Sequence, residues 1–389
     1  MSNRADPNLL KELKKYGEAE IESCFNCGNC TAICPLATDE TPFPRNNIRM
    51  VQLGLRDRLM SSLDPWLCYY CGDCSATCPR KAEPGEAQMT MRRWLTAQYD
   101  WTGLARKFYT SPVWEIGSIL FVSLFMVWMF VLFAGPMETD HVALNTFAPV
   151  QRIHYGDWAL AAFLSFFLLS NVFRMYWLTL RKDAKAKIPF LLYVTEAWTL
   201  VRHFATQKKF EKCDENQKGF FQKKRWRNHW FLVSGYVLMF AMVVGFLPWF
   251  QTDNIYPIYH PQRWLGYYAT IVLLYGGFDI LWGRIKQEHQ SHRFSHLSDW
   301  IFPILLLLTT ISGIMVHTFR YLDLPLATYY TYAAHLVILT PMLVLEVPFG
   351  KWSHLAYRPL AVYFQAIKEK AKQRQEVAVG AVAAVAATD

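Results

Sequence analysis

Six long apolar runs in the second part of the chain constrain its fold more than any other feature. A helix needs about 20 apolar residues to cross ~30 Å of hydrocarbon, and lipid leaves backbone polar groups no partner outside the helix. The runs cover about 112–134, 157–180, 230–250, 264–284, 298–320 and 326–348. At 53% hydrophobic and 18% charged residues, the chain is too apolar for an ordinary soluble enzyme. We therefore predict an all-α fold containing a six-helix transmembrane bundle.

The distribution of Lys and Arg predicts the orientation of these helices. The segment 181–228 carries thirteen of them, whereas the loops on the other side hold only Arg152, Arg263 and Arg320. Basic loops remain cytoplasmic, so both termini are expected in the cytoplasm, at the cytoplasmic (inner) membrane. Basic residues that alternate with apolar runs indicate contact with membrane lipid and no nucleic-acid partner.

Eight of the nine cysteines form two copies of C-x2-C-x2-C-x3-C-P, spaced 44 residues apart. In two-cluster ferredoxins, three cysteines of such a run bind one [4Fe–4S] cluster and the fourth binds the other. The first cluster is therefore assigned to Cys24, Cys27, Cys30 and Cys78. The second is assigned to Cys68, Cys71, Cys74 and Cys34. Structural zinc is the alternative, but zinc sites typically use separated C-x2-C pairs, which two full quartets fit poorly.

The domain boundaries follow from these two patterns. Residues 1–107 are predicted to be a cytoplasmic, α-helical dicluster ferredoxin domain, because the 33 residues between the quartets have a helical pattern. Residues 108–365 are the transmembrane haem b domain, and 366–389 are a low-complexity cytoplasmic tail. No secretory signal precedes the cysteines, so thiols are expected to bind metal in a reducing compartment. Cys213 is expected to be a free thiol.

Histidines in the apolar region are candidate haem b ligands, because axial histidines from bundled helices commonly hold haem. His229 and His354 are placed at the cytoplasmic face, where they are predicted to bind a proximal haem. His335 precedes His354 by 19 residues, which is ~28 Å along a continuous helix, so it is placed near the outer face. The alternative for His229 and His354 is interfacial snorkelling.

A distal haem is assigned to His335 with either His317 or His260, and Met239 is a weaker candidate. His317 and His260 are also candidates for a quinone site, where they could accept a proton or hydrogen-bond a quinone oxygen. Glu346 is a third candidate for the quinone site and, with Asp279, a candidate for proton transfer. Arg174 could pair with a haem propionate. The alternative for all three residues is snorkelling. The remaining histidines are expected to be solvated: His141, His154, His203, His289, His292 and His296.

Two resemblances narrow these assignments. The stretch HLVILTPMLVLEVPFGKWSHLAYRPLAVY resembles the final helix of nitrate reductase γ-type cytochromes b, with His335 and His354 at its two ligand positions. His229, in RNHWFLVSGYVLMF, matches the inner ligand of that family's second helix, and Met239 stands where the family has its other histidine. This resemblance implies two haems b.

The cysteine half resembles the small iron–sulfur protein of heterodisulfide reductase, known as its C subunit. The fusion of both halves, over residues 20 to 365, is similar to the C subunits of the quinone-interacting membrane-bound oxidoreductase (Qmo) complexes. That resemblance implies cytoplasmic flavin and iron–sulfur partners related to the flavoprotein of heterodisulfide reductase, its A subunit. It also implies an electron link between menaquinone (or menaquinol) and adenylylsulfate reductase in dissimilatory sulfur metabolism.

The sequence thus predicts the electron-transferring membrane subunit of a quinone-dependent oxidoreductase. One alternative is a heterodisulfide-reductase-type membrane subunit that uses a quinone or methanophenazine pool. An alternative of another class is a haem-free membrane anchor for a ferredoxin domain. A transporter is disfavoured because the helices show no internal repeat.

Overall fold

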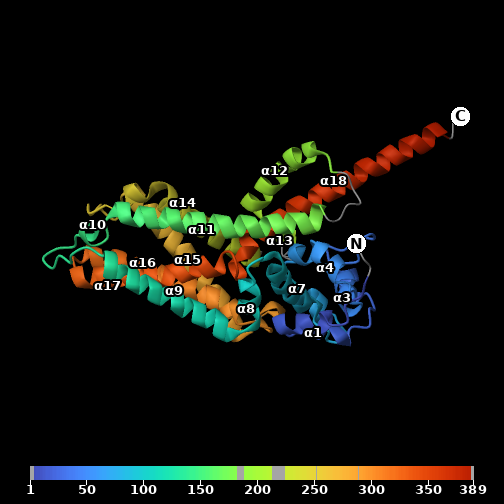
Figure 1. Ribbon diagram of the computed structural model, residues 1–389, viewed down its shortest axis with the longest axis horizontal. Coiled ribbons are helices and arrows are strands. Elements are labelled where there is room, and N and C mark those ends of the chain that lie inside the picture. Colours follow the sequence, from blue (N-terminus) through green and yellow to red (C-terminus); the bar gives the residue numbers. More distant parts are fainter. Residues whose placement is uncertain (1–3, 182–187, 213–223, 251, 288, 387–389) are drawn as a thin grey trace. The chain divides into compact units, whose positions relative to one another are not determined.

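The computed structural model describes residues 4–181, 188–212, 224–250, 252–287 and 289–386, and within these ranges all regular secondary structure is helical (Figure 1). This confirms the predicted all-α fold. The chain divides into two compact units. The first comprises Met1–Arg106, Leu169–Lys218 and Ser353–Asp389, and the second comprises Lys107–Leu168 and Gly219–Trp352. We describe each unit by itself.

The N-terminal part of the first unit is a set of short helices around one longer helix. They are α1 (Leu9–Leu13), α2 (Asn29–Ile33), α3 (Arg45–Gln52), α4 (Arg56–Ser61), α5 (Asp64–Leu67), α6 (Asp73–Ala76) and α7 (Pro84–Tyr99). The helical pattern predicted between the cysteine quartets is thereby confirmed. α7 begins with proline, which fits the first helical turn, and it buries Met91, Trp94 and Leu95 completely. This buried side supports the loops that carry the cysteines.

The six predicted spans are all helical, and each of the helices is long and apolar enough to cross a membrane. They are α9 (Pro112–Phe133), α11 (Val150–Tyr176, prolonged to Arg181 by the π-helical turn η3), α14 (Lys224–Phe250), α15 (Pro261–Lys286), α16 (Ser298–Tyr321) and α17 (Pro325–Pro341, prolonged to Glu346 by the π-helical turn η5). The short helices α8 (Leu104–Thr110) and α10 (Leu144–Phe147) flank α9.

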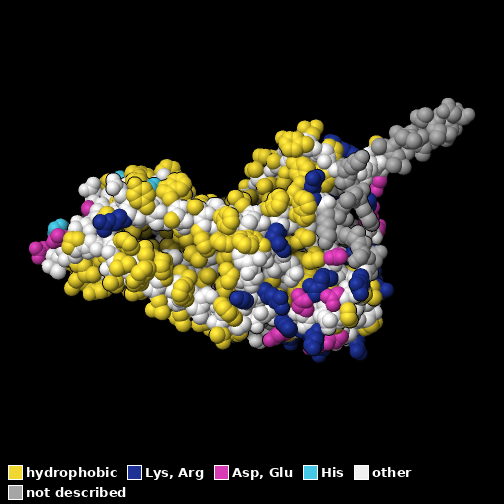
Figure 2. Space-filling view, viewed as in Figure 1, with side chains coloured by type: hydrophobic (Ala, Val, Ile, Leu, Met, Phe, Trp, Pro, Cys, Tyr) yellow, Lys and Arg dark blue, Asp and Glu magenta, His cyan; other side chains and the backbone are white. Residues whose placement is uncertain are grey.

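Helices of the second unit pack in a series. α9 contacts α17, α17 contacts α16, α16 contacts α15, and α15 contacts α14. Their outward side chains are apolar: Val113, Phe121 and Leu124 of α9 are 80%, 72% and 68% exposed. Figure 2 shows apolar side chains over these long helices. Apolar surface of this extent is normally covered by lipid or protein, so it agrees with the predicted spans.

The last span ends earlier than the sequence suggests. The expectation that one helix runs unbroken from His335 to His354 is wrong, because η5 ends at Glu346 and α18 (His354–Ala386) begins only at His354. Pro348 lacks an N–H, and the Glu346 carboxylate accepts a hydrogen bond from the Lys351 N–H at 2.9 Å, which supports a turn. The helical rise used to separate the two histidines therefore does not apply.

The segment 181–228 contains helices where a plain connecting loop was expected. They are α12 (Phe190–Thr206) and α13 (Lys208–Lys212). α12 packs on α18 through Leu192, Ile367 and Ala371, all of which are buried. Cys213 lies outside the described residues.

Candidate metal centre

The two cysteine quartets have the same local backbone. Gly28 and Gly72 stand between the second and third cysteines, with φ of 95° and 93°, and they begin α2 and α6. Glycine adopts this left-handed conformation without a steric penalty. The N–H of Asn26 donates to Cys24 Sγ at 3.4 Å, and that of Tyr70 donates to Cys68 Sγ at 3.3 Å. Each quartet thus forms the same turn around its first sulfur.

The last cysteine of each quartet lies near cysteines of the other quartet. Burial, together with the neighbouring thiols Cys24, Cys27 and Cys78, raises the pKa of Cys30. Burial raises the pKa of Cys34 to about 11, and the nearby thiols Cys68 and Cys71 of the other quartet add to this effect. The first group of thiols is therefore Cys24, Cys27, Cys30 and Cys78.

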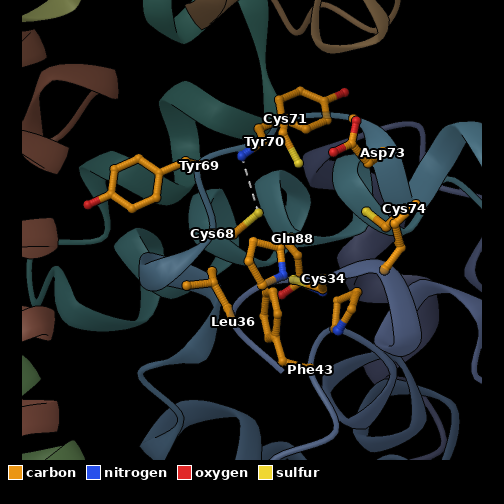
Figure 3. Close-up of a pocket in the computed structure, with 14 residues that line it drawn as sticks. Cys34, Leu36, Phe43, Cys68, Tyr69, Tyr70, Cys71, Asp73, Cys74 and Gln88 are labelled. Atoms are coloured by element: carbon orange, nitrogen blue, oxygen red, sulfur yellow. Dashed lines mark hydrogen bonds between the residues drawn. The ribbon is translucent and has the colours of Figure 1, made fainter. Parts of the chain in front are cut away.

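The second group lines one pocket. Figure 3 shows Cys34, Cys68, Cys71 and Cys74 around it, with Phe43 and Leu36 from the first quartet's side. Burial raises the pKa of Cys74, and Cys68, Cys71, Cys34 and Cys30 add to the effect. Because Cys30 belongs to the first group, the two groups adjoin through Cys30 and Cys74.

The spacing of the thiols distinguishes two kinds of metal centre. A tetrahedral zinc site brings four ligands to one ion and typically uses separated C-x2-C pairs, whereas each thiolate of a [4Fe–4S] cluster binds a different iron. Two full C-x2-C-x2-C-x3-C-P quartets have the ligand pattern of a two-cluster ferredoxin.

The second thiol group has two arginines beside it that the sequence analysis did not identify. The Arg92 guanidinium donates to the carbonyl oxygens of Cys68 and Pro65, and Arg358 donates to the same Cys68 carbonyl at 2.8 Å. Burial lowers the pKa of Arg92 to about 9, with Arg358 as a further cause. Arg358 also lies 4.0 Å above the Tyr69 ring. The two cations favour extra negative charge at this group.

His203 also lies next to the second group. It was expected to be solvated, but it is only 8% exposed, and its Nε2 lies 3.3 Å from the Tyr69 hydroxyl. Burial lowers its pKa to about 4, and Arg358 and Lys209 add to this. Its partner is 134 residues away in sequence, so no local pattern signals the contact.

The first thiol group is closer to solvent. Cys27 is exposed, and the neighbouring Phe25 is 59% exposed. Gln52 holds this loop in place, because its amide donates to the carbonyls of Cys24 at 2.7 Å and Ile21 at 3.0 Å.

His335 of α17 has a defined ring orientation within the second unit. Its Nδ1 lies 3.0 Å from Ser312 Oγ of α16, and the Ser312 hydroxyl donates to the Thr309 carbonyl at 3.0 Å. The serine oxygen therefore accepts from Nδ1–H, which leaves Nε2 with its lone pair. Metal-binding histidines commonly have this arrangement. The geometry of His335 thus suits a ligand of haem iron. Gly313 leaves room for its imidazole ring, because a Cβ there would lie 3.2 Å from His335 Cε1.

His317 and His260 belong to one aromatic cluster at the ends of α15 and α16. His317 Nε2 lies 3.0 Å from the Tyr267 hydroxyl, and its ring is 4.3 Å from Tyr321. His260 stacks on Tyr256 at 4.4 Å and caps α15 by accepting from the Gln262 N–H. Arg263 lies over both Tyr256 and Tyr321, at 5.9 and 5.6 Å, and connects the two histidines.

The other candidates are distributed over both units. His229 and Met239 are in α14, in the second unit, whereas His354 begins α18 in the first unit. Glu346 is 3% exposed, and it lies near Glu115 of α9, which is also buried. Asp279 accepts from the Asn228 amide at 2.9 Å and pairs with Lys224, and Arg174 donates to the Gln98 carbonyl.

The histidines expected to be solvated differ among themselves. His141 and His289 are exposed, as expected. His154 accepts a hydrogen bond from the Trp158 indole at 2.8 Å. His292 is half-buried, and burial lowers its pKa to about 4, followed in effect by Arg284. His296 Nε2 lies 2.9 Å from the Tyr109 carbonyl.

Comparisons with known proteins match two parts of the chain separately: the cysteine-containing part and most of the part with the long apolar helices. Residues 20–82 match the 4Fe-4S dicluster domain family, and residues 146–376 match the citrate utilization protein B family. The chain is 33% identical over 130 residues to a protein of Archaeoglobus profundus that is named for its likeness to the C subunit of heterodisulfide reductase. That match covers 32% of this chain and 68% of the relative.

A second relative is the C subunit of the H(2):CoB-CoM heterodisulfide,ferredoxin reductase of Methanothermobacter marburgensis, 37% identical over 63 residues. The corresponding protein of Methanothermobacter thermautotrophicus matches equally. The chain spans about one third of each of these two relatives, with 34% of their length covered by 16% of this chain. No solved structure matches the chain significantly.

Proposed function

The chain belongs to the iron–sulfur proteins that resemble the C subunit of heterodisulfide reductase and, through residues 146–376, to the citrate utilization protein B family, and we propose that it is the membrane subunit of a quinone oxidoreductase complex. As a member of the first family, it is an iron–sulfur electron-transfer component. In the proposed function, electrons pass between menaquinone, two haems b and two [4Fe–4S] clusters, and then to or from cytoplasmic partners.

One observation carries this proposal: two adjoining groups of four thiols and a hydrogen-bonded histidine among membrane-length helices occur in the same chain. [4Fe–4S] clusters transfer single electrons. Cys24, Cys27, Cys30 and Cys78 would hold the first cluster, and Cys68, Cys71, Cys74 and Cys34 the second. Cys30 and Cys74 bring the two groups together, so an electron has a short path between them.

Residues 1–107 would form the cytoplasmic iron–sulfur domain, residues 108–365 the haem b domain, and both termini would be cytoplasmic. His335 would bind a distal haem through Nε2, with Ser312 holding its ring. His317 or His260 would be its second ligand, and Met239 is a weaker candidate. His229 and His354 would bind the proximal haem.

The aromatic cluster around His317 supports a quinone site. Tyr267 and His317 are hydrogen-bonded to each other, and together they would offer a quinol hydroxyl one donor and one acceptor. Arg263 provides a positive charge nearby. His260, 4.4 Å from Tyr256, borders the same cluster. In this role His317 would hydrogen-bond a quinone oxygen or accept its proton. Glu346 with Glu115 would offer a second path for protons.

The partners follow from the resemblance to the Qmo complexes. They would be flavin and iron–sulfur proteins related to the A subunit of heterodisulfide reductase, linked to adenylylsulfate reductase. The names of the Archaeoglobus and Methanothermobacter relatives favour a second candidate, a heterodisulfide-reductase-type membrane subunit with a quinone or methanophenazine pool. The soluble proteins that co-purify with the chain would separate the two.

Haem b per chain tests the proposal first. A pyridine haemochrome assay on detergent-purified protein is expected to give a value near two, and a menaquinol analogue is expected to reduce that haem. A value near one would remove His335 from the ligands. Protein without haem would be a membrane anchor for the iron–sulfur domain, and haem that no quinol reduces would exclude a quinone oxidoreductase.

A further inference from the structure

α12 is amphipathic, but it exposes its apolar side, whereas a helix of a water-soluble domain buries that side. Its buried side carries Leu192, Glu196 and His203, which are 0%, 3% and 8% exposed. Its exposed side is apolar: Phe190, Leu191, Val194, Trp198 and Val201 are 80%, 59%, 57%, 68% and 53% exposed. At 3.6 residues per turn these five side chains share an arc of about 100°. A helix in water turns such a stripe toward the protein core.

Polar contacts fix this orientation of the helix. Lys370 of α18 forms an ion pair with Glu196, and the Thr199 hydroxyl donates to the same carboxylate at 2.9 Å. One turn further on, His203 meets Tyr69 at 3.3 Å. The Tyr363 hydroxyl also donates to the Tyr193 carbonyl at 2.7 Å. Rolling α12 to bury its apolar stripe would break all of these contacts, so the stripe must be covered from outside.

The position of α12 in the chain indicates what covers it. The helix starts nine residues after Arg181, which ends the second span, and the third span starts at Lys224. Both neighbouring segments therefore return to the membrane surface. At 17 residues, with Glu196 and Arg202 inside it, α12 is too short and too polar to be a span itself.

Basic residues complete the pattern. Arg202 is exposed at the edge of the apolar stripe, and Lys208 and Lys209 follow the end of the helix. A tryptophan-containing apolar face with Lys and Arg at its border is the pattern of helices that lie in a membrane interface. Cationic side chains at this level attract anionic lipid head groups. Figure 2 shows apolar side chains in the region where Figure 1 labels α12.

We propose that α12 lies in the plane of the membrane interface and buries Phe190, Val194 and Trp198 among lipid acyl chains, with Arg202, Lys208 and Lys209 at anionic head groups. The contact does not depend on haem or quinone. Its other side holds Tyr69, the neighbour of Cys68, so lipid contact and the second thiol group share one helix.

Photo-cross-linking of the full chain tests this contact. p-Benzoylphenylalanine is placed at Trp198, at Phe190 or, as a matched control, at Leu53, which is 49% exposed in the iron–sulfur region. Each variant is reconstituted in phosphatidylethanolamine vesicles that contain a minority of phosphatidylglycerol. After illumination, mass spectrometry is expected to find phospholipid on positions 190 and 198, and none above background on position 53. Visible iron–sulfur absorbance shows that each variant has folded.

A second set of variants separates lipid contact from chance reactivity. Trp198→Glu is expected to remove most of the lipid adduct at position 190, and Leu53→Glu to leave it unchanged. A polypeptide adduct in place of lipid at positions 190 and 198 would show that a protein covers the stripe, and would overturn the proposal. So would lipid labelling no stronger than at position 53.

Discussion

The Ser312 hydroxyl lies 3.0 Å from Nδ1 of His335 and donates its own proton to the Thr309 carbonyl. Two neighbouring spans, α16 and α17, thus fix the ring of the histidine that the sequence places within the apolar part of the last span. In the proposed function, an imidazole held in this way would present Nε2 to a haem iron.

Ser312→Ala is expected to weaken haem binding roughly 10- to 100-fold, the usual cost of losing the hydrogen-bond partner of a metal-binding histidine. His335→Ala should lower haem b from near two to near one per chain. Haem titration of the haem-depleted protein measures both. Ser234→Ala, in α14, is the matched control, because that hydroxyl donates to the Phe231 carbonyl and its side-chain partner is the Tyr268 hydroxyl, at 2.6 Å. Unchanged haem affinity in Ser312→Ala would contradict the assignment of His335.

Double cysteine variants can show that the two quartets cross. Cys27→Ser with Cys78→Ser removes two ligands of the same cluster, so the protein should keep the other cluster and about four irons per chain. Cys27→Ser with Cys34→Ser damages both clusters and should leave almost no iron. Iron analysis and electron paramagnetic resonance of the reduced protein give the readout. If each quartet held its own cluster, the two results would be exchanged.

Arg358→Gln is expected to lower the reduction potential of the second cluster by tens of millivolts. The guanidinium donates to the Cys68 carbonyl at 2.8 Å, and removing its positive charge makes the added electron less stable. Arg358→Lys keeps the charge and should recover much of the potential. Redox titration followed by electron paramagnetic resonance distinguishes the two clusters, and the first cluster serves as the internal reference. Equal shifts in Gln and Lys variants would rule out an electrostatic cause.

His203 should make the iron–sulfur unit less stable in mild acid. Burial lowers its pKa in the folded protein from 6.5 to about 4, so the unfolded state binds the proton more readily. The stability that the neutral His203 ring contributes is fully present above pH 6.5, and it is lost as the pH falls toward 4. Between pH 7.5 and 5.5 the loss from this group is about 1 kcal/mol.

The measurement is the guanidinium midpoint, followed by visible iron–sulfur absorbance at both pH values. His203→Gln should reduce the dependence on pH, because glutamine does not titrate in this range. His289→Gln alters an exposed ring and is the control. A pH dependence as steep in His203→Gln as in the parent chain would refute the explanation.

The six long apolar helices could be predicted from sequence because an apolar run of this length has few other stable backbone structures. Each apolar run became a helix, with ends within a few residues of those expected except at α11 and α14, which begin earlier. The break after Glu346 was missed although Pro348 and Gly350 signal it, because Val347 and Phe349 keep the hydropathy high where the helix stops. Hydropathy indicates whether a segment prefers lipid or water, but it does not indicate whether the helix is continuous.

The surroundings of the site were harder to predict. The cysteine spacing predicts which thiols share a cluster, since that pattern constrains local geometry, and this assignment stays a prediction. Arg92, Arg358 and His203 reach the second group from distant segments, and nothing in their own neighbourhoods marks them. α12 was missed for a different reason: a segment rich in Lys and Arg was interpreted as a loop, although its apolar residues follow a helical period.

The exchange of Cys34 and Cys78 between the two quartets has a consequence for synthesis. In the proposed assignment, Cys24, Cys27 and Cys30 leave the ribosome long before Cys78, so the first cluster would lack its fourth ligand until the second quartet is made. Cys34 would likewise be made before Cys68, Cys71 and Cys74, its proposed partners in the second cluster. Both clusters would then be completed only after the second quartet is translated, and the first quartet would have to stay reduced until that point.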